Sequence, residues 1–448
     1  MQKLFGTDGI RGLADVFPLD RLTVEKIGSS LARIFAEKHS NPARFVIGRD
    51  TRESGERLEH AFAFGAASQG AEIESAGVTT TPGVAYLTRA FEFDAGIVIS
   101  ASHNPYQDNG IKVFLPSGAK LDESSERLIE QDIAEGISHS DTGRSRELDR
   151  SRTDEFRLSY EQHLTSRFPQ LNLEGRKIVL DCANGAASRI APETFRRFGA
   201  EIITLNDRPD GRNINHNCGS LHLDELQYRT RTEKADFGIA FDGDADRALL
   251  VDHDGKVVDG DAILWVLSCF FQSRGGLANK TVVATVMSNI GLELALTSRS
   301  LKLIRAAVGD KYVLEELLRS GSEIGGEQSG HIILPKESLV GDGIVSSLFV
   351  VAAMQDAAAD LSDLTNGFVR YPQTLVNVKV REKRPFDSVA EIAAASSGVE
   401  NELKGRGRLL LRYSGTENLA RVMIEGEDQQ TIETQAKRLA QVISSSLG

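Results

Sequence analysis

Hydrophobic and polar positions follow one pattern three times along this chain. In each copy an apolar run typical of a strand precedes a loop of small residues, a helical stretch and a second strand. The copies begin at Phe45–Asp50, Lys177–Asp181 and Thr281–Ala284, and their helices are expected through Ala67, near Ala191–Phe198 and near Leu292–Ser298. Such alternation predicts mostly parallel sheets with helices on their faces.

Each copy ends in a comparable way, with a short apolar strand that runs into a polar loop containing glycine. The three segments are Gly96–Pro105, Phe237–Arg247 and Ser322–His331. Ligands of open parallel sheets bind beyond the carboxyl ends of the strands. We therefore expect the three loops to converge on one site, the alternative being a chance similarity within a large α/β protein.

The C-terminal part of the chain differs. A helix is expected over Asp342–Leu361, followed by strands, a helical stretch and a final amphipathic helix to Ile443, which predicts a small α+β domain with an antiparallel sheet. The 448 residues are too many for one core. We expect four domains: residues 1–155, 156–255 and 256–367, which share a mixed, mostly parallel α/β topology, and the smaller domain 368–448.

Composition narrows the partners and the compartment. The formal net charge of −12 disfavours a general nucleic-acid or anionic-membrane binder, yet it allows a phosphorylated small molecule held by a local basic cluster. The three cysteines form no CxxC pair, which argues against a disulfide scaffold and against a zinc site. No apolar run reaches about 18 residues and no signal core is present, so a cytoplasmic location is expected.

The first loop of interest is Ser100–Pro105. Ser102 lies beside His103 after an apolar strand, and Lys112 follows on another strand-like segment. A serine hydroxyl becomes a nucleophile when a base, a cation or a metal activates it. Ser102 is therefore a candidate nucleophile, although an ordinary turn with an Asn-Pro breaker would look similar.

The second loop, Asp242–Arg247, carries a carboxylate at every second residue. Asp242, Asp244 and Asp246 would repel one another without a cation between them, and oxygen ligands suit Mg²⁺. A calcium EF-hand is excluded because its sixth and twelfth positions hold Arg247 and His253. The loop therefore predicts a metal site, with a solvated acidic turn as the alternative.

The third loop, Gly326–His331, places polar side chains between glycines that let the backbone approach a ligand. Glu327 and Ser329 suit vicinal sugar hydroxyls, and His331 could exchange a proton near neutral pH. A tight turn with polar decoration is the alternative.

The fourth loop begins at Arg412 and is followed by Arg421. The hydroxyls and backbone N–H groups of Ser414, Gly415 and Thr416 would form an anion nest, and the two arginines add donors suited to phosphate oxygens. A hairpin turn with surface arginines is the alternative.

Nucleotide-binding devices are missing from the sequence. The segment GGLANKT lacks the glycine of a Walker pattern before Lys280, and no GxGxxG follows a strand. A kinase or a dehydrogenase is therefore disfavoured. A metal, a serine and a phosphate nest without a nucleotide site indicate phosphoryl transfer within a small molecule.

Five motifs in order, FGTDGIRG (Phe5–Gly12), SASHNP, DGDADR, GEQSGH and RYSGTEN, make the chain resemble the α-D-phosphohexomutase superfamily. The resemblance covers essentially the whole chain. FGTDGIRG and the glutamine of GEQSGH favour the branch that acts on glucosamine phosphates over the branches that act on glucose or mannose phosphates.

This resemblance implies four domains around a central cleft and interconversion of glucosamine 6-phosphate and glucosamine 1-phosphate, through a phosphorylated Ser102 and a bisphosphorylated sugar that also serves as primer. It implies Mg²⁺ held by Asp242, Asp244, Asp246 and an oxygen on Ser102, with Arg247 beside the metal and Arg11 near the phosphoserine. It assigns sugar hydroxyls to Glu327 and Ser329, the non-reacting phosphate to Arg412, Ser414, Gly415, Thr416 and Arg421, and proton transfer to Lys112 and His331, with His103 in support.

Other interpretations stay open at this point. The substrate could be a glucose or mannose phosphate, since no acidic partner for the C2 amino group is evident, and a sugar phosphatase or a non-catalytic binding protein would share several features. A homodimer is the candidate assembly. Two positions depart from the family pattern: Asn418 replaces a common proline, and Lys311 stands where arginine is common, which keeps a basic donor but loses its bidentate geometry.

Overall fold

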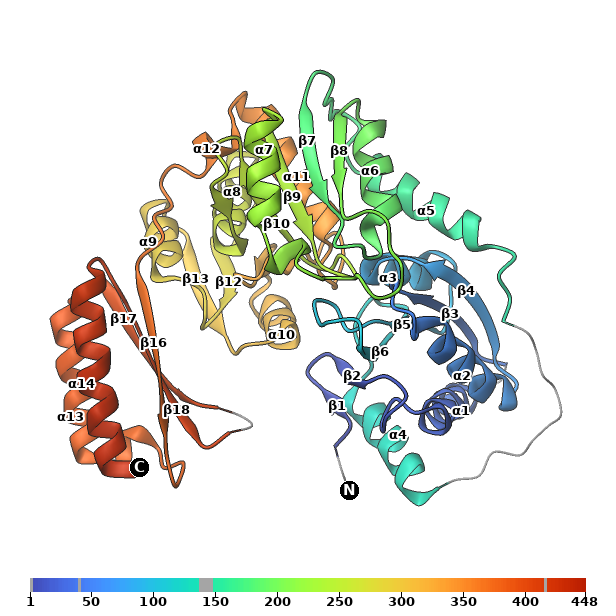
Figure 1. Cartoon of the computed structure of the whole chain (residues 1–448), viewed down its shortest axis with the longest axis horizontal. Coiled ribbons are helices and arrows are strands. Elements are labelled where there is room, and N and C mark those ends of the chain that lie inside the picture. The colour runs from blue at the N-terminus through green and yellow to red at the C-terminus, as the bar shows by residue number, and fades with distance from the viewer. Residues whose placement is uncertain (1–2, 39–41, 137–147, 415–416) are drawn as a thin grey trace. The chain divides into compact units, whose positions relative to one another are not determined.

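Four β-sheets organise the part of the chain that the computed structural model describes, residues 3–38, 42–136, 148–414 and 417–448 (Figure 1). The chain forms two units. The first comprises the described residues up to Met287 together with Leu303–Asn366, and the second comprises Ser288–Lys302 together with Gly367–Gly448. The first unit carries three of the sheets and the second carries the fourth.

The first sheet has strands β1 Phe5–Gly6, β2 Gly9–Leu13, β3 Arg44–Arg49, β4 Glu72–Val78, β5 Ala95–Ile99 and β6 Asp108–Phe114, with helices α1 Arg21–Lys38, α2 Gly55–Ser68, α3 Thr81–Ala90 and α4 Glu123–Glu135. The strand order is β1-β2-β6-β5-β3-β4. β3 is parallel to both β4 and β5, and β6 is antiparallel to β5. Every residue of β5 is buried, as expected for a strand covered on both faces.

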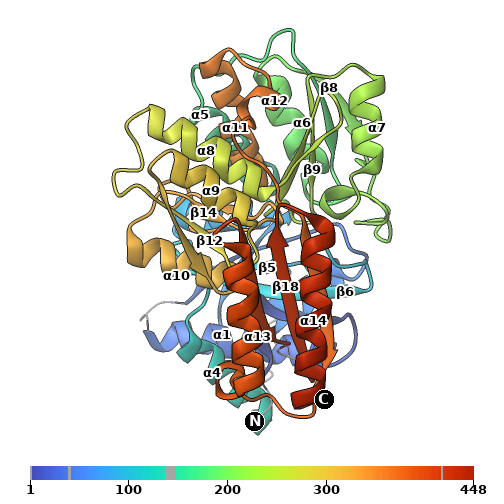
Figure 2. The ribbon, with the colours of Figure 1, turned by 90° about the vertical axis from the view of Figure 1, so that its left-hand side faces the viewer.

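The second sheet has strands β7 Lys177–Asp181, β8 Glu201–Leu205, β9 Phe237–Phe241, β10 Ala248–Asp252 and β11 Val257–Val258, with helices α5 Thr153–Ser166, α6 Ala187–Arg197, α7 Asp224–Thr232 and the 3₁₀ turn η1 Gly219–Leu221. Its order is β11-β10-β9-β7-β8. α6 and α7 lie on opposite sides of the sheet (Figures 1 and 2). β9 and β10 are antiparallel, with Phe241 opposite Ala248, so they present residues 242–247 as a hairpin loop.

The third sheet has strands β12 Thr281–Thr285, β13 Lys302–Ala306, β14 Gly325–Gly326 and β15 Ile332–Ile333, with helices α8 Gly260–Ser273, α10 Asp310–Ser320, α11 Gly343–Ala357 and α12 Leu361–Leu364. Its order is β13-β12-β14-β15. β14 is parallel to β12 and antiparallel to β15.

These three sheets repeat one strand order. Numbered within each copy, the strands lie in the order fourth, third, first, second: β6-β5-β3-β4, β10-β9-β7-β8 and β15-β14-β12-β13. In every copy the third strand is parallel to the first, and the fourth strand returns antiparallel to the third. The predicted triplicated α/β topology is therefore confirmed, and the loop that follows the third strand of each copy occupies an equivalent place.

The second unit contains strands β16 Gln373–Lys379, β17 Gly407–Tyr413 and β18 Leu419–Gly426, helices α9 Ile290–Ser298, α13 Ala390–Leu403 and α14 Gln429–Leu447, and the 3₁₀ turn η2 Phe386–Ser388. The sheet order is β16-β18-β17, antiparallel throughout, as predicted. α13 and α14 lie side by side on one face of this sheet (Figure 2). α9 joins this unit because Ile290 N–H donates to the buried Glu425 carboxylate at 3.1 Å.

Several helix bounds differ from the expected ones. α6 begins at Ala187 rather than near Ala191, because a proline inside the helix, Pro192, is accommodated without ending it. α11 ends at Ala357, where the next residue turns into the left-handed region (φ 47°), and a separate short helix follows. α14 extends four residues past Ile443. The boundaries at residues 155, 255 and 367 stay predictions.

The described helices include no candidate for a membrane span, because none of them combines the necessary length with a sufficiently apolar composition.

The packing of α1 against α2 requires glycine at the crossing. A Cβ on Gly65 would lie 1.8 Å from the backbone oxygen of Glu25, and a Cβ on Gly28 would lie 2.2 Å from that of Phe62. Both helices cover the largest buried cluster of the first sheet, which includes Phe62. Backbone therefore meets backbone at this crossing, and neither helix can move without uncovering the core.

We predict that Gly65→Ala lowers the free energy of unfolding by about 2–3 kcal/mol, because the added methyl must separate two packed helices. Gly398→Ala is the matched control, since that glycine lies inside α13 and a Cβ added there would meet no atom within 4 Å. The control should gain about 0.5–1 kcal/mol from helix propensity. Denaturant unfolding measures both, and equal effects of the two substitutions would contradict the close-packing argument.

Candidate active site

Ser102 is held on the loop between β5 and β6 in a left-handed backbone conformation (φ 53°), with its side chain buried. Its N–H donates to the Ser100 hydroxyl at 2.9 Å, and that hydroxyl donates to Asp50 Oδ2 at 2.7 Å. The Ser102 hydroxyl donates to Asp242 Oδ2 at 2.6 Å. The structure thus brings the predicted nucleophile into direct contact with the predicted metal loop, 140 residues away in the chain.

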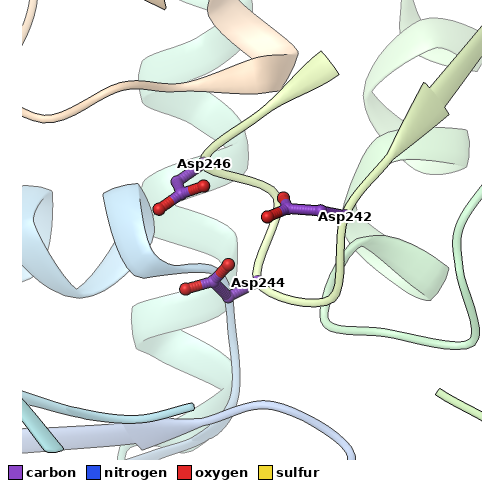
Figure 3. A group of neighbouring side chains, drawn as sticks. All are labelled: Asp242, Asp244 and Asp246. Atoms are coloured by element: carbon purple, nitrogen blue, oxygen red, sulfur yellow. The ribbon is translucent and has the colours of Figure 1, made fainter. Parts of the chain in front are cut away.

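The three aspartates of the β9–β10 loop point toward a common centre (Figure 3). One oxygen from each of Asp242, Asp244 and Asp246 lies within 4.8 Å of the others, and all three residues are buried. Gly243 lets this loop lie against the serine loop, because a Cβ there would stand 2.5 Å from the Ser102 carbonyl oxygen. Only glycine allows this approach without displacing one of the loops.

Lys112, on β6, supplies the nearest fixed positive charge. Its fully buried ammonium lies 3.0 Å from Asp244, 3.3 Å from Asp246 and 3.1 Å from Asp8. Burial would lower the pKa of Lys112, but the surrounding carboxylates raise it well above its usual value, so it stays charged. For Asp246, burial would raise the pKa, yet Lys112 and then His331 bring it well below its usual range.

The donor set of the triad fits a divalent ion. Oδ1 of Asp244 and Oδ1 of Asp246 are buried and accept no hydrogen bond from the described residues. Burial, followed by the charges of Asp246 and Asp244, raises the pKa of Asp242 well above its usual value, and a cation bound at the triad would oppose this shift. Hard carboxylate oxygens that lack donors are what Mg²⁺ or Ca²⁺ requires.

A cavity of about 420 Å³ lies beside the triad. Its lining consists of Leu4, Gly6, Thr7, Asp8, Gly9, Arg11, Asp246, Arg247, Val308, Gly309, Asp310, Glu327 and His331. The cavity therefore combines the FGTDGIRG segment of the first sheet, the metal loop of the second and two loops of the third. It has room for a monosaccharide phosphate, within the usual range of small-molecule sites.

Two arginines give this cavity donors for an anion. Arg11 pairs with Asp8, and its Nε is buried without a hydrogen-bond partner among the described residues, as is the Nε of Arg247. Burial would lower the pKa of Arg247, but Asp246 and then Asp242 raise it. Both guanidiniums are therefore charged, and both arginines line the cavity.

The GEQSGH loop contributes Glu327 and His331 to the cavity, but Ser329 is not among the lining residues. Glu327 Oε1 accepts the N–H of Gly309 at 3.1 Å, which orients the carboxylate. The Ser329 hydroxyl is buried without a hydrogen-bond partner among the described residues. Gly330 (φ 88°) is required here, since a Cβ would lie 2.2 Å from the Ala248 carbonyl oxygen.

Their surroundings shift the pKa values of the two histidines in opposite directions. His331 Nδ1 lies 3.6 Å from Asp246 and its Nε2 lies 3.9 Å from Asp310. Burial would lower the pKa of His331, but Asp246 and then Asp310 raise it. His103 Nδ1 lies 3.2 Å from the Ser102 hydroxyl, and burial, with Arg247 and Arg11 nearby, lowers its pKa to about 4. His103 is thus a neutral hydrogen-bond partner at neutral pH.

In the second unit, Arg412 on β17 lies directly opposite Arg421 on β18. Burial and then the neighbouring Arg421 charge lower the pKa of Arg412. Like charges on opposite strands cost stability unless an anion joins them. Ser414 follows β17 and is buried, with its carbonyl accepting from Lys383 Nζ at 2.7 Å. The predicted contacts of Gly415 and Thr416 lie outside the described residues.

Several residues at the site carry no strong local signal in the sequence. Lys120 Nζ bridges Asp8 at 2.6 Å and Asp310 at 2.5 Å, joining the first and third sheets. Asp8 lies inside the FGTDGIRG motif, but Lys120 lies in no motif. Lys311, which stands where arginine is common, pairs with Glu123 at 2.5 Å and does not line the 420 Å³ cavity.

Comparisons with known proteins place the chain in a family. Residues 2–139, 159–255 and 259–371 match phosphoglucomutase/phosphomannomutase alpha/beta/alpha domains I, II and III, and residues 375–442 match the C-terminal domain of the same family. The chain belongs to the phosphoglucomutase/phosphomannomutase family, and the resemblance to the α-D-phosphohexomutases is confirmed.

One relative and two solved structures illustrate this similarity. A protein of Solibacter usitatus named phosphoglucosamine mutase is 47% identical over 452 residues, covering 99% of each chain. A phosphoglucomutase/phosphomannomutase family protein from Burkholderia thailandensis shares the fold at 22% identity and TM-score 0.80, covering 100% of this chain and 98% of that one. An Aspergillus fumigatus N-acetylphosphoglucosamine mutase, solved with GlcNAc-6P and magnesium, has 19% identity and TM-score 0.66, covering 99% and 96%.

We predict that the triad binds a divalent metal, measurable by titration with Mn²⁺ as a paramagnetic probe. Asp244→Asn should weaken this binding at least about tenfold, because it removes a charged ligand. Asp252→Asn is the matched control: Asp252 is also buried, but it accepts backbone N–H groups of Asp254 and Lys256, which an amide oxygen can still do. Equal affinity in wild type and Asp244→Asn would remove the triad as the metal site.

Proposed function

We propose that this protein interconverts glucosamine 6-phosphate and glucosamine 1-phosphate through a phosphorylated Ser102. The observation that carries the proposal is the 2.6 Å contact between the Ser102 hydroxyl and Asp242 of a buried carboxylate triad that borders a cavity of sugar-phosphate size. The 47% identity to a protein named phosphoglucosamine mutase supports the choice of glucosamine phosphate over glucose or mannose phosphate.

The reaction proceeds in two phosphoryl transfers. In the first, the bond between phosphorus and Ser102 Oγ breaks while the free hydroxyl of the sugar monophosphate forms a bond to the same phosphorus. The proton that this hydroxyl loses is balanced by one gained at Ser102 Oγ. The bisphosphorylated sugar then turns end for end. In the second transfer the bond between the other phosphorus and its sugar oxygen breaks while Ser102 Oγ forms a bond to that phosphorus. The proton of the Ser102 hydroxyl passes to the sugar oxygen, which restores the phosphoenzyme and releases the isomeric monophosphate. Such transfers depend mainly on positioning and on charge stabilisation.

Asp242, Asp244 and Asp246, with an oxygen on Ser102, would hold Mg²⁺. When bound, this ion neutralises charge on the phosphoryl group being transferred. The chain's own cations act around it: Arg247 lies beside the triad, and Arg11 lines the same cavity. The magnesium named for the Aspergillus fumigatus complex supports this choice of ion.

Proton transfer is assigned to Lys112 and His331, with His103 in support. Of these three, His331 is the one that lines the cavity, which favours it for proton exchange with a sugar hydroxyl. Lys112 is enclosed by three carboxylates and first serves to keep them charged and together. His103 contacts the Ser102 hydroxyl itself and orients it.

The sugar and its non-reacting phosphate are held by the two remaining loops. Glu327, which lines the cavity, is proposed to bind a sugar hydroxyl, whereas Ser329, whose buried hydroxyl does not line it, stays a prediction. The phosphate that is not being transferred is assigned to Arg412, Ser414, Gly415, Thr416 and Arg421. The juxtaposed charges of Arg412 and Arg421 support an anion site, because a dianion would relieve their repulsion. A cytoplasmic location, a homodimer and a sugar 1,6-bisphosphate primer stay predictions.

A substrate panel tests the proposed function. With Mg²⁺ and glucose 1,6-bisphosphate as primer, glucosamine 6-phosphate should be converted with the highest kcat/KM, ahead of glucose and mannose 6-phosphates. Ser102→Ala should lower turnover by more than about 10³-fold because the covalent route is lost. Higher kcat/KM for another hexose would reassign the substrate, net release of inorganic phosphate would show a phosphatase, and an active Ser102→Ala would remove the nucleophile.

We predict that Arg412→Ala raises KM for the sugar phosphate about tenfold or more, since a charge-assisted hydrogen bond contributes roughly 1.5–3 kcal/mol. Arg406→Ala is the control. Arg406 precedes the same strand, is 67% exposed in its side chain and pairs with Glu427 on the surface at 3.3 Å. Steady-state kinetics of both variants measure the difference, and a KM unchanged in Arg412→Ala would take Arg412 out of the phosphate site.

A further inference from the structure

The carbonyl oxygen of Ser102 accepts hydrogen bonds from two side chains that no sequence motif singled out, the buried Arg52 and the half-buried Asn215. Arg52 Nη2 donates to it at 2.9 Å, and Asn215 Nδ2 donates to it at 2.8 Å. The same two nitrogens also donate to the Asn104 carbonyl, at 2.9 and 3.0 Å. A carbonyl oxygen has two lone pairs, so both acceptors on this loop are satisfied from two sides at once.

Arg52 uses its whole guanidinium on this loop. The side chain is fully buried, and Nη1 donates to the carbonyls of Pro105 and of Asp108, the latter at 2.9 Å. Its Nε donates to Asp50 Oδ2 at 2.8 Å, and the same carboxylate oxygen accepts the Ser100 hydroxyl. The Arg52–Asp50 ion pair therefore binds the loop both before Ser102, at Ser100, and after it, at the carbonyls that follow.

Asn215 reaches the loop from a different sheet. It lies in the connection between β8 and α7, where its own backbone is left-handed (φ 56°) and its N–H donates to the Ala183 carbonyl at 2.9 Å. The metal loop also packs against the Ser102 carbonyl oxygen. A Cβ on Gly243 would lie 2.5 Å from that oxygen, so the loop can approach it only with glycine at this position. The orientation of the peptide group between Ser102 and His103 is thus fixed by Arg52 of the first sheet and by Asn215 and the metal loop of the second.

We propose that Arg52 and Asn215 are positioning residues that hold the left-handed backbone of Ser102 so that its oxygen, with or without phosphate, faces the aspartate triad. The proposal rests on the proposed function of Ser102. The peptide that follows Ser102 sets the ψ angle of that residue, and hence the direction of its side chain. Neither residue lines the substrate cavity, so loss of either one acts on the phosphoryl-transfer step rather than on sugar binding.

Two variants test this positioning role. Asn215→Gly removes the two side-chain donors while keeping a residue that tolerates positive φ. Arg52→Lys keeps the charge beside Asp50 but cannot donate to four carbonyls at once. Each variant should lose about 10–100-fold in kcat, the scale of a small misplacement of a reacting group, with KM for glucosamine 6-phosphate within about twofold of wild type.

Asn217→Gly is the matched control for the asparagine. Asn217 lies two residues along the same loop with φ 53°, and it is exposed to solvent rather than turned against the buried serine loop. It should keep wild-type kcat. Thermal midpoints are measured for all variants, and Asn215→Gly is the deciding variant should Arg52→Lys fold poorly.

The outcomes separate this proposal from the proposed function. Wild-type protein without mutase activity would refute the function itself. An active wild type together with wild-type kcat in Asn215→Gly would overturn the positioning role, and so would an equal loss of kcat in Asn217→Gly. A rise in KM at unchanged kcat would also overturn it, because it would place the residues in substrate binding.

Discussion

The site depends on the compensation of three carboxylates that are buried within 4.8 Å of one another. Isolated burial of even one carboxylate is costly, so this cluster persists only because cations reach it from several directions. Lys112 comes from the first sheet, Arg247 lies between the triad and β10, and His331 comes from the third sheet. The same electrostatic requirement that would hold a metal ion therefore ties three repeated sheets together.

Backbone geometry makes this convergence possible. The serine loop and the metal loop approach so closely that Gly243 has no room for a side chain, and Ser102 itself adopts a left-handed conformation. Non-glycine residues in that region are uncommon and are held by their surroundings, often at functional sites. Here the surroundings are hydrogen bonds to the Ser102 carbonyl and the contact of its hydroxyl with Asp242.

Patterns of neighbouring residues predicted the features that depend on neighbouring residues, namely the strands and the loops that follow them. The apolar runs of β3, β7 and β12 predicted the three sheets, and the rule that ligands bind beyond strand ends brought Ser102, the aspartates and Glu327 to one region. Contacts between residues that are far apart in the sequence and lie in no motif could not be predicted in this way. Lys120 joins Asp8 to Asp310, and Arg52 reaches four carbonyls, through side-chain directions that only the folded chain determines. The ion pair between Lys311 and Glu123 is a further contact of this kind.

The charges around the cavity explain why metal and phosphate binding would support each other. Negative charge in this region comes from Asp8, Asp244, Asp246, Asp310 and Glu327. Among the described residues, the fixed cations facing it are Arg11, Lys112, Lys120 and Arg247. Most of these cations are already engaged: Lys112 contacts three carboxylates and Lys120 contacts two. A phosphate dianion that enters the cavity is therefore only weakly attracted by the protein alone. A divalent ion on the triad would reverse that balance, and a phosphorylated Ser102 would in turn complete the oxygen ligands of the ion, so each of the three charged groups would lower the cost of placing the other two.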